Sequence, residues 1–373
     1  MKVIFITNHF QRSDGVAQVL LNLCNFLAIK KDYEVSILPL YRVENDFVTC
    51  VHKKVKVIKG LGFYFRGLTR LISLLPIGSL RKLFGVVGYD VEIAFQSGLP
   101  TQIVGCNKTS SIKTVKVIWI HGFKLWASEF LNADIVVCIS KWAKNHLQTL
   151  LPQINRVQIC HNLIDEKRIK TLASKKHSKI EKIGKQGKIQ LITVGRLSPE
   201  KGVLRFLSVL STLKEEKGCD FCYWIVGDGP ERALISKQIK ELNLEDSVHM
   251  LGEQSNPYVY IKDSDLYVCP SYSEGYSTTC VEASILGVPV LTTDVPGARE
   301  IVEMAEAGMV VQNTERGLRD GLIKVIEEKK MLETWSKKLQ TTSHNFFSSS
   351  KECEVEELFQ LIENLLQRKQ IKE

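Results

Sequence analysis

Two glutamates separated by seven residues are the clearest candidates for functional residues in this sequence. Glu274 and Glu282 enclose a polar segment. A helix that runs to about Leu286 is expected to begin in this segment, where Ser277, Thr278 and Thr279 lie. The first N–H groups of a helix lack an internal partner, so they suit an anion such as a phosphate. Carboxylates on either side of that phosphate can bind hydroxyls. This fits a nucleotide sugar, whose sugar and ribose flank a diphosphate.

A second segment, GRLSPEKG at residues 195–202, supplies positive charge. It follows an apolar run, residues 189–194, that predicts a buried strand. Arg196 offers a planar fork of donors to phosphate oxygens, and Lys201 adds a point charge. Two such cations can neutralise the charge that grows on a departing diphosphate. A surface turn with two solvated cations is the alternative interpretation.

These segments, EGYSTTCVE and GRLSPEKG, resemble the signature of the retaining glycosyltransferases of the GT-B fold. The resemblance is to family 4, the glycosyl transferases group 1, of the type that builds bacterial capsule, O-antigen and lipid-linked oligosaccharides. It implies two Rossmann-like domains with doubly wound parallel sheets that face a cleft. It also implies transfer from a nucleotide sugar, with a UDP-sugar favoured, in which the leaving phosphate takes the acceptor proton. Relatives need no metal, so neither a metal nor a cofactor is expected.

The resemblance assigns roles in the donor site residue by residue. Glu274 would bind sugar hydroxyls and Glu282 the ribose, while Arg196 and Lys201 would stabilise the leaving phosphate. His121 follows a predicted strand and would lie by the anomeric carbon. The expected catalytic residues are His121, Glu274, Arg196 and Lys201. The expected donor-binding residues are Arg196, Lys201, Gly227, Gly252, Glu274, Ser277, Thr278 and Glu282.

Asp14 and Gly15 form the expected acceptor-side loop after the first strand. Family members usually have two adjacent glycines here, whereas this chain keeps only one of them. An ordinary turn from a strand to a helix explains Gly15 equally well. The implied acceptor is a glycan or an undecaprenyl-diphosphate-linked saccharide.

The length of 373 residues predicts two domains rather than one core. The N-terminal, acceptor-binding domain is expected at 1–175 and the C-terminal, nucleotide-sugar-binding domain at 176–350. An amphipathic helix at 351–373 would cross back to the first domain. A charged segment, 171–188, is the expected linker. Strand signals in the first domain fall near 2–7, 34–38, 55–58, 91–95, 114–120, 135–139 and 156–160.

Positive charge is concentrated in the first half of the chain. Residues 1–175 carry 24 Lys and Arg against 11 Asp and Glu, although the whole chain has a net charge of +9. The window 51–85 has no acidic residue and places Leu68, Leu71, Ile72 and Leu75 at helical spacing. Its cations include Arg66, Arg70, Arg81 and Lys82. We therefore expect this window to dock on an anionic membrane surface, with a core-packing helix as the alternative.

Three other classes of protein are weighed against the transferase. A sugar-nucleotide epimerase of the same fold would bind the donor without an acceptor. A non-catalytic nucleic-acid binder would use the basic half, but interleaved stacking aromatics are missing and no nucleic-acid partner is expected. A dehydrogenase lacks G-x-G-x-x-G after the first strand. No apolar run reaches a membrane span, so a cytoplasmic protein, peripheral on the inner face of the plasma membrane, is expected.

Overall fold

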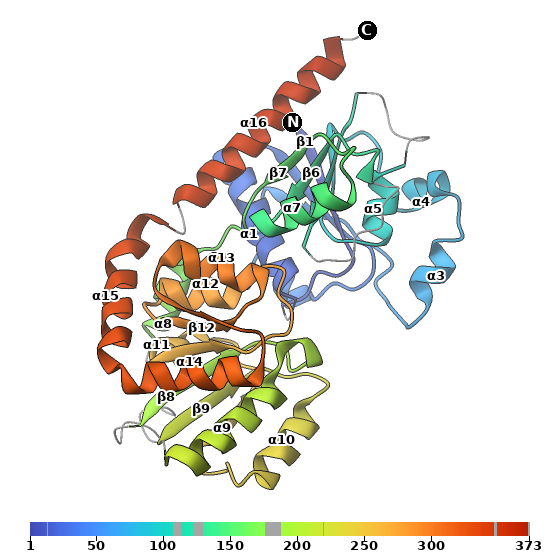
Figure 1. The fold of residues 1–373 in the computed structure, drawn as a ribbon. Helices are drawn as coiled ribbons and strands as arrows, with labels where there is room; N and C mark the ends of the chain where they lie inside the picture. The colour runs from blue at the N-terminus through green and yellow to red at the C-terminus, as the bar shows by residue number, and fades with distance from the viewer. Residues whose placement is uncertain are drawn as a thin grey trace. The chain divides into compact units, whose positions relative to one another are not determined.

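The computed structural model describes residues 1–12, 14–106, 113–121, 130–175, 188–218, 220–346 and 349–371. The chain forms two compact units (Figure 1). Unit 1 comprises Met1–Ile164 with Ser350–Glu373, and unit 2 comprises Asp165–Ser349. The division thus falls after Ile164, whereas the sequence placed it after residue 175. Most of the expected linker, residues 176–187, lies outside the described residues.

Unit 1 is built on a parallel sheet of seven strands in the order β3-β2-β1-β4-β5-β6-β7. The strands are β1 (Lys2–Thr7), β2 (Glu34–Pro39), β3 (Val55–Val57), β4 (Val91–Ala94), β5 (Val115–Ile120), β6 (Ile135–Cys138) and β7 (Val157–Ile159). All seven lie where the sequence predicted strands. Their apolar runs are buried nearly throughout, as expected for a parallel sheet that is covered on both faces.

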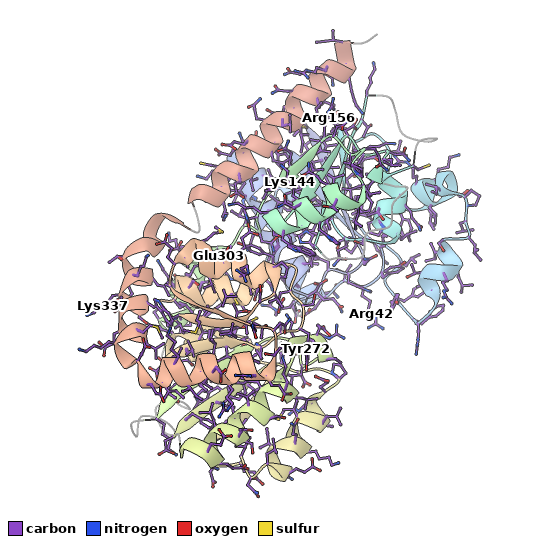
Figure 2. The ribbon with its side chains drawn as sticks, viewed as in Figure 1. Arg42, Lys144, Arg156, Tyr272, Glu303 and Lys337 are labelled. Atoms are coloured by element: carbon purple, nitrogen blue, oxygen red, sulfur yellow. The ribbon has the colours of Figure 1, made fainter. Side chains whose placement is uncertain are left out.

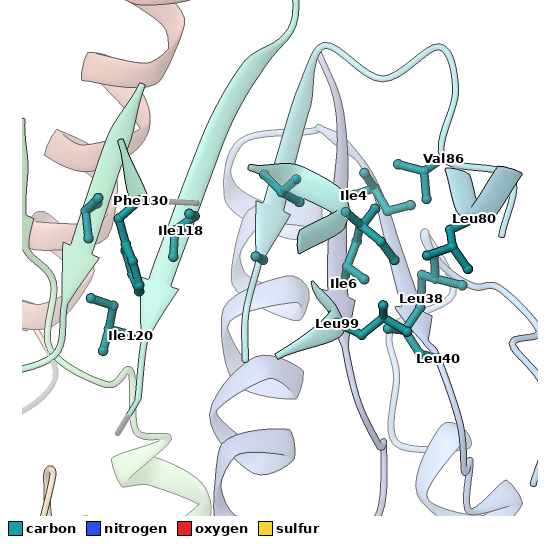
Figure 3. Packing of buried hydrophobic residues seen from close by; sticks show 14 of the residues in the cluster. Ile4, Ile6, Leu38, Leu40, Leu80, Val86, Leu99, Ile118, Ile120 and Phe130 are labelled. Carbon is teal, nitrogen blue, oxygen red and sulfur yellow. The ribbon is translucent and has the colours of Figure 1, made fainter. Parts of the chain in front are cut away.

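The described helices of unit 1 pack against this sheet. They are α1 (Gly15–Lys30), α2 (Asn45–Val48), α3 (Leu68–Ile72), α4 (Ile77–Leu83), α5 (Leu99–Val104), α7 (Lys141–Leu150) and α16 (Ser349–Ile371). Alternate side chains of β1 and β5 point to one face, where Ile4, Ile6, Ile118 and Ile120 join a core with Leu80 of α4 (Figure 3). No helix in the described part of the chain has the length and apolarity needed to cross a bilayer.

The last helix, α16, belongs to unit 1 although it follows all of unit 2 in the sequence. Its buried apolar residues include Val355, Phe359 and Ile362. The Tyr33 hydroxyl donates a hydrogen bond to Glu363 of α16 at 2.5 Å. Unit 1 is therefore discontinuous in sequence and is completed by the end of the chain.

Unit 2 contains a second parallel sheet, of six strands in the order β10-β9-β8-β11-β12-β13. The strands are β8 (Ile189–Val194), β9 (Phe221–Val226), β10 (Val248–Gly252), β11 (Leu266–Cys269), β12 (Val290–Thr293) and β13 (Gly308–Val311). The order reverses between β8 and β11, as it reverses between β1 and β4 in unit 1. Ligands of such sheets bind at the carboxyl ends of strands beside this reversal.

The helices of unit 2 lie before, between and after these strands in the chain (Figure 1). They are α8 (Glu166–Ala173), α9 (Val203–Lys217), α10 (Arg232–Glu241), α11 (Tyr258–Lys262), α12 (Thr278–Ile285), α13 (Pro296–Ala305), α14 (Glu315–Glu327) and α15 (Lys329–Phe346), with a short 3-10 turn at Pro199–Lys201. Residues of α9, α10 and α14 share one core cluster with the sheet. Helix α8 contacts α11 and α12, which explains why the division precedes it.

Candidate active site in unit 2

A pocket opens at the carboxyl ends of β8 and β11, beside the reversal of strand order. Its lining residues are Thr193, Val194, Gly195, Arg196, Leu197, Lys201, Val203, Tyr267, Cys269, Pro270, Ser271, Glu274 and Thr279. The pocket thus brings together three expected site residues, Arg196, Lys201 and Glu274. The donor-binding residues Gly227, Gly252 and Glu282 do not line it.

Lys201 and Glu274 form an ion pair in this pocket. The ammonium of Lys201 lies 2.7 Å from Oε1 of Glu274. The Ser271 hydroxyl donates to the same oxygen at 2.8 Å, and the Glu274 side chain is largely buried. Burial acts to lower the pKa of Lys201, but the Glu274 carboxylate outweighs it and raises the pKa above its ordinary value. Lys201 therefore stays charged at neutral pH.

Arg196 presents a free cation at the edge of the pocket. Its side chain is exposed, and it makes no hydrogen bond or ion pair with another described residue. Its guanidinium therefore needs no rearrangement before it binds an anion. Lys201, in contrast, must share its charge between Glu274 and any ligand.

Helix α12 begins at Thr278, as the sequence predicted. The Ser277 side chain caps it by accepting a hydrogen bond from the Cys280 N–H at 3.4 Å. Thr279 lines the pocket, and its hydroxyl oxygen accepts from the Tyr267 hydroxyl at 2.7 Å. The expected ligands Ser277 and Thr278 thus belong to the helix start, whereas Thr279 is the side chain of this turn that reaches the pocket. The N–H groups of the first turn suit an anion.

Glycines bring the loops around the pocket into close contact. A Cβ on Gly297 would lie 2.5 Å from the carbonyl carbon and oxygen of Gly275, so only glycine lets α13 begin against the Glu274 loop. A Cβ on Gly227 would lie 1.9 Å from the carbonyl oxygen of Gly195. The Gly227 N–H donates to the Gly252 carbonyl at 2.8 Å. Gly227 and Gly252 therefore align the exits of β8, β9 and β10.

Glu282 lies one turn into α12, away from the lining of this pocket. The Tyr258 hydroxyl of α11 donates to its Oε1 at 3.3 Å. Burial raises the pKa of Glu282 to about 7, although this hydrogen bond and the nearby Arg168 act in the opposite direction. Part of this carboxyl therefore stays protonated at neutral pH, where an ordinary glutamate is charged.

The expected acceptor-side residues lie at the carboxyl edge of the unit 1 sheet. Asp14 caps α1 by accepting from the Val16 N–H at 2.9 Å, and it accepts a second bond from the Gln96 amide at 3.1 Å. Gln96, which follows β4, also accepts from the Thr7 hydroxyl at 2.9 Å. A Cβ at Gly15 would meet nothing within 4 Å. The loop is thus fixed by Asp14, and space remains open above Gly15.

His121 follows β5 at the same edge of the unit 1 sheet. Its ring centroid lies 4.4 Å from that of Phe95. Burial lowers its pKa to about 3, so the imidazole is neutral at physiological pH. Its Nε2 is buried without a hydrogen-bond partner among the described residues. A second histidine, His9, follows β1, and its buried Nδ1 has no hydrogen-bond partner in the part of the chain that the structure describes. The sequence analysis did not single it out.

Arg205 and Tyr272 support the loop beside the pocket, and the sequence did not predict a role for either of them. Arg205 on α9 is buried and donates to the carbonyl oxygens of Pro270 and Ser271 at 2.6–2.8 Å. Its guanidinium stacks on the ring of Tyr272, 3.7 Å from the centroid; Tyr272 is labelled in Figure 2. Nothing local distinguishes Arg205 from the solvated arginines of other helices. Only its partners, 65 and 66 residues away, give it a role.

The structure corrects part of the membrane prediction for the window 51–85. Arg81 does not face solvent: its guanidinium forms a two-pronged ion pair with Glu92 at 2.6 and 2.7 Å, and both side chains are buried. The predicted apolar face is also divided, because α3 ends at Ile72. Leu68 and Ile72 are buried in the core of unit 1, whereas Leu71 and Leu75 are exposed.

Comparisons with known proteins agree with this architecture. Residues 175–342 match the family described as glycosyl transferases group 1. The 2-deoxystreptamine N-acetyl-D-glucosaminyltransferase of Niallia circulans is 30% identical over 151 residues, which span 40% of this chain and 39% of that relative. A Campylobacter jejuni enzyme, the N-acetylgalactosamine-N,N'-diacetylbacillosaminyl-diphospho-undecaprenol 4-alpha-N-acetylgalactosaminyltransferase, is 27% identical, over 71% of this chain and 75% of its own.

Among solved structures, Anabaena HepE in complex with UDP is similar with a TM-score of 0.73 and 18% identity, covering 98% of this chain and 100% of that one. At this identity the likeness concerns the fold, and it confirms the expected GT-B fold of two doubly wound sheets. The matched residues 175–342 include the whole of the pocket described above. Residues 175–342 of this chain are therefore similar to the glycosyl transferases group 1 family.

Proposed function

We propose that this chain is a retaining glycosyltransferase that transfers a sugar from a nucleotide sugar to a glycan or lipid-linked acceptor in the synthesis of bacterial surface polysaccharide. The observation that carries the proposal is the pocket at the β8–β11 reversal. It combines Arg196, a cation with no partner among the described side chains, with the ion pair of Lys201 and Glu274 at the start of α12. Two cations and a helix N-terminus suit a diphosphate, and the carboxylate beside them suits sugar hydroxyls.

In the proposed reaction, the bond between the anomeric carbon and the diphosphate oxygen breaks, and its electron pair stays on that oxygen. Arg196 and Lys201 stabilise the growing negative charge. The acceptor hydroxyl oxygen bonds to the anomeric carbon on the face that the phosphate leaves. Its proton passes to a phosphate oxygen, so the products are a nucleoside diphosphate and a glycosylated acceptor. His121 would lie beside the anomeric carbon as a neutral imidazole that can donate or accept a hydrogen bond.

A UDP-sugar is the proposed donor, supported by the UDP complex of the structurally similar HepE. Glu282 is the proposed ribose ligand. An undecaprenyl-diphosphate-linked saccharide is the leading acceptor, because the Campylobacter relative acts on such a lipid by its name. We also propose that the reaction needs no metal. Turnover should then be unchanged by EDTA, and a loss of activity that Mg²⁺ restores would contradict this.

The proposed function can be tested with a panel of UDP- and GDP-sugars, each incubated with and without glycan and lipid-linked acceptors. Mass spectrometry should detect a product that is heavier by one sugar residue, and NMR should show the anomeric configuration of the donor retained. Glu274→Gln should sharply reduce the rate of product formation, but a measurable residual rate should remain, while Glu333→Gln, an exposed change on α15, should not reduce it. Epimerised donor without any transferred sugar would favour the epimerase instead.

A membrane-facing surface on unit 1 is a further part of the proposal. Seven large apolar side chains between residues 63 and 87 are 46–80% exposed. These seven, which we call the apolar patch, are Phe63, Phe65, Leu71, Leu74, Leu75, Leu83 and Val87. Arg66, Arg70 and Lys82 are exposed in the same segment, and no acidic residue occurs from 51 to 85. Apolar side chains flanked by cations suit the interface of an anionic bilayer, where each cation contributes about 1 kcal/mol.

Docking of the apolar patch would bring the protein to the cytoplasmic leaflet, where a lipid-linked acceptor lies. Changing Arg66, Arg70 and Lys82 to Glu should release the protein from liposomes that contain anionic lipid, while donor hydrolysis stays intact. Changing Lys237, Arg316 and Lys337 of unit 2 to Glu makes the same charge change at exposed positions and should not release it. If both triple variants lose co-sedimentation equally, net charge alone explains the binding. That result would contradict a specific membrane-binding surface at the apolar patch.

A further inference from the structure

Arg205 is a charged residue buried in unit 2 whose donors are directed at one loop. It lies in the first turn of α9 and is 5% exposed. Its Nε and one terminal nitrogen donate to the Pro270 carbonyl at 2.8 and 2.6 Å, and that terminal nitrogen also donates to the Ser271 carbonyl at 2.7 Å. A guanidinium fork that binds two consecutive carbonyls fixes the direction of the backbone between them.

The loop that Arg205 holds leads directly to Glu274. Both the backbone and the side chain of Ser271 make hydrogen bonds. Its carbonyl accepts from Arg205 and, at 2.6 Å, from the Thr293 hydroxyl. Its hydroxyl donates to Glu274 Oε1 at 2.8 Å. The approach is close enough to require a glycine, because a Cβ on Gly202 would lie 2.1 Å from the Pro270 oxygen. The chain of contacts therefore runs from Arg205 through the Ser271 backbone to the carboxylate that pairs with Lys201.

We infer that Arg205 is a positioning residue, which holds the Ser271 backbone so that the Glu274 carboxylate stays in place in the pocket. This inference rests on the proposed function, in which Glu274 binds hydroxyls of the donor sugar. A displacement of about 1 Å in such a group can cost about 10²-fold in rate. Arg205 itself does not line the pocket, so it acts through the loop.

The test compares four variants of the full-length protein. Arg205→Met removes the fork, and Arg205→Lys keeps the charge but lacks the rigid planar fork that fixes the geometry of both carbonyls. Thr293→Val removes the other hydrogen bond to the Ser271 carbonyl with little change of volume. Arg319→Met is the matched control, because Arg319 of α14 pairs with Glu216 of α9 in the same unit, away from Glu274.

Positioning predicts a specific pattern of kinetics. Arg205→Met should lower kcat/KM for the nucleotide sugar about 10²-fold, and Thr293→Val should lower it less. Arg205→Lys should recover part of the loss. The Kd for UDP should change less than about twofold in all of them, because Glu274 would contact the sugar rather than the nucleotide. In a Glu274→Gln background, Arg205→Met should cost less than about twofold more, since residues that act through one another are not additive.

Hydrogen–deuterium exchange of residues 271–275 supplies a readout that does not depend on activity. It should rise in Arg205→Met and Thr293→Val but not in Arg319→Met. Unchanged exchange, a parallel loss of UDP affinity, or additivity with Glu274→Gln would overturn the inference. If the wild-type protein processes no nucleotide sugar, the proposed function fails, while the exchange result still decides whether Arg205 holds the loop. Should Arg205→Met fail to fold, Thr293→Val alone decides by the same measurements.

Discussion

Arg196 and Lys201 carry the same charge in one pocket, but their surroundings differ. Arg196 is exposed and unpaired among the described residues, so Arg196→Ala should change the free energy of unfolding by less than about 0.5 kcal/mol. If Arg196 stabilises the leaving diphosphate, its loss should lower kcat about 10²–10³-fold. Steady-state kinetics and urea unfolding on the same preparations check both values. Wild-type kcat in Arg196→Ala would remove it from the diphosphate site.

Lys201→Ala should behave differently, because it leaves the largely buried Glu274 carboxylate without its 2.7 Å partner. An unpaired buried group of this kind costs about 1–3 kcal/mol, so stability should fall together with turnover. The double variant Lys201→Ala with Glu274→Gln should recover stability but not activity. Recovery of both would mean that the ion pair is structural only.

Glu282 gives the protein a predicted pH dependence of stability. Burial raises its pKa in the folded state to about 7, from an ordinary value of 4.5. Below pH 4.5 the carboxyl is protonated in both states. As the pH rises towards 7, the unfolded chain releases this proton first, so the free energy of unfolding should fall, by about 3 kcal/mol in all. Urea unfolding at pH 5 and pH 8 should show the fall in wild type and not in Glu282→Gln.

The exposed variant Glu333→Gln should keep the wild-type pH dependence and serves as the control. Nucleotide binding supplies a second readout for Glu282. Ribose hydroxyls would bind the charged carboxylate, so Glu282→Ala should weaken UDP binding by about 1.5–3 kcal/mol in calorimetry. An unchanged Kd would exclude Glu282 as the ribose ligand.

A partly buried polar contact near the start of α16 links this helix to unit 1. The Nδ1 atom of His161 lies 2.8 Å from Glu354, and the His161 backbone N–H donates to the same carboxylate at 2.9 Å. Burial acts to raise the pKa of Glu354, but the bonds from His161 outweigh it and lower the pKa to about 2. The stabilisation is therefore present above the ordinary pKa of 4.5 and is lost as the pH falls from 4.5 towards 2.

Glu354→Ala should thus lower the free energy of unfolding by about 2–3 kcal/mol at pH 7, and the difference from wild type should shrink at pH 3. Glu356→Ala, on the exposed side of the same helix, is the control and should change little. Denaturant unfolding followed by circular dichroism measures both. A difference between Glu354→Ala and wild type that does not vary with pH would show that Glu354 acts through packing rather than charge.

At the scale of the whole molecule, unit 1 depends on a helix that follows unit 2 in the chain. Phe359 of α16 is fully buried and packs 5.9 Å from the ring of Tyr33. Phe359→Ala should destabilise unit 1 by about 3–5 kcal/mol. UDP affinity should persist, because the proposed site lies in unit 2. Calorimetry with and without UDP distinguishes the unfolding transitions of the two units, since a ligand stabilises the unit that binds it.

If UDP raises the melting temperature of unit 2 in Phe359→Ala as much as in wild type, UDP binding by unit 2 does not depend on the stability of unit 1, as proposed. Leu210→Ala in the core of unit 2 is the reciprocal control. This variant should lower the melting temperature of the UDP-sensitive transition, which belongs to unit 2, and leave the melting temperature of unit 1 unchanged. A loss of UDP binding in Phe359→Ala alone would contradict this division.

The local features of this protein were determined by its sequence. Apolar runs predicted every strand of unit 1, because a parallel strand that is covered on both faces must be apolar along its length. Ser140 caps α7, and α12 begins within the EGYSTTCVE segment, since capping needs only residues next to one another in the chain. The segments around Arg196 and Glu274 were recognisable for the same reason: each is a short stretch at the end of a strand.

Only the tertiary structure decided what the long side chains contact. Arg81 was predicted to face lipid, yet it pairs with Glu92 on a neighbouring strand. No sequence motif pointed to Arg205, although its partners belong to the loop before Glu274. An arginine on a helix has the same local signal whether it is solvated or buried. What it contacts depends on which carbonyls and carboxylates the fold brings to it, and those lie up to 22 residues away for Arg81 and up to 66 for Arg205.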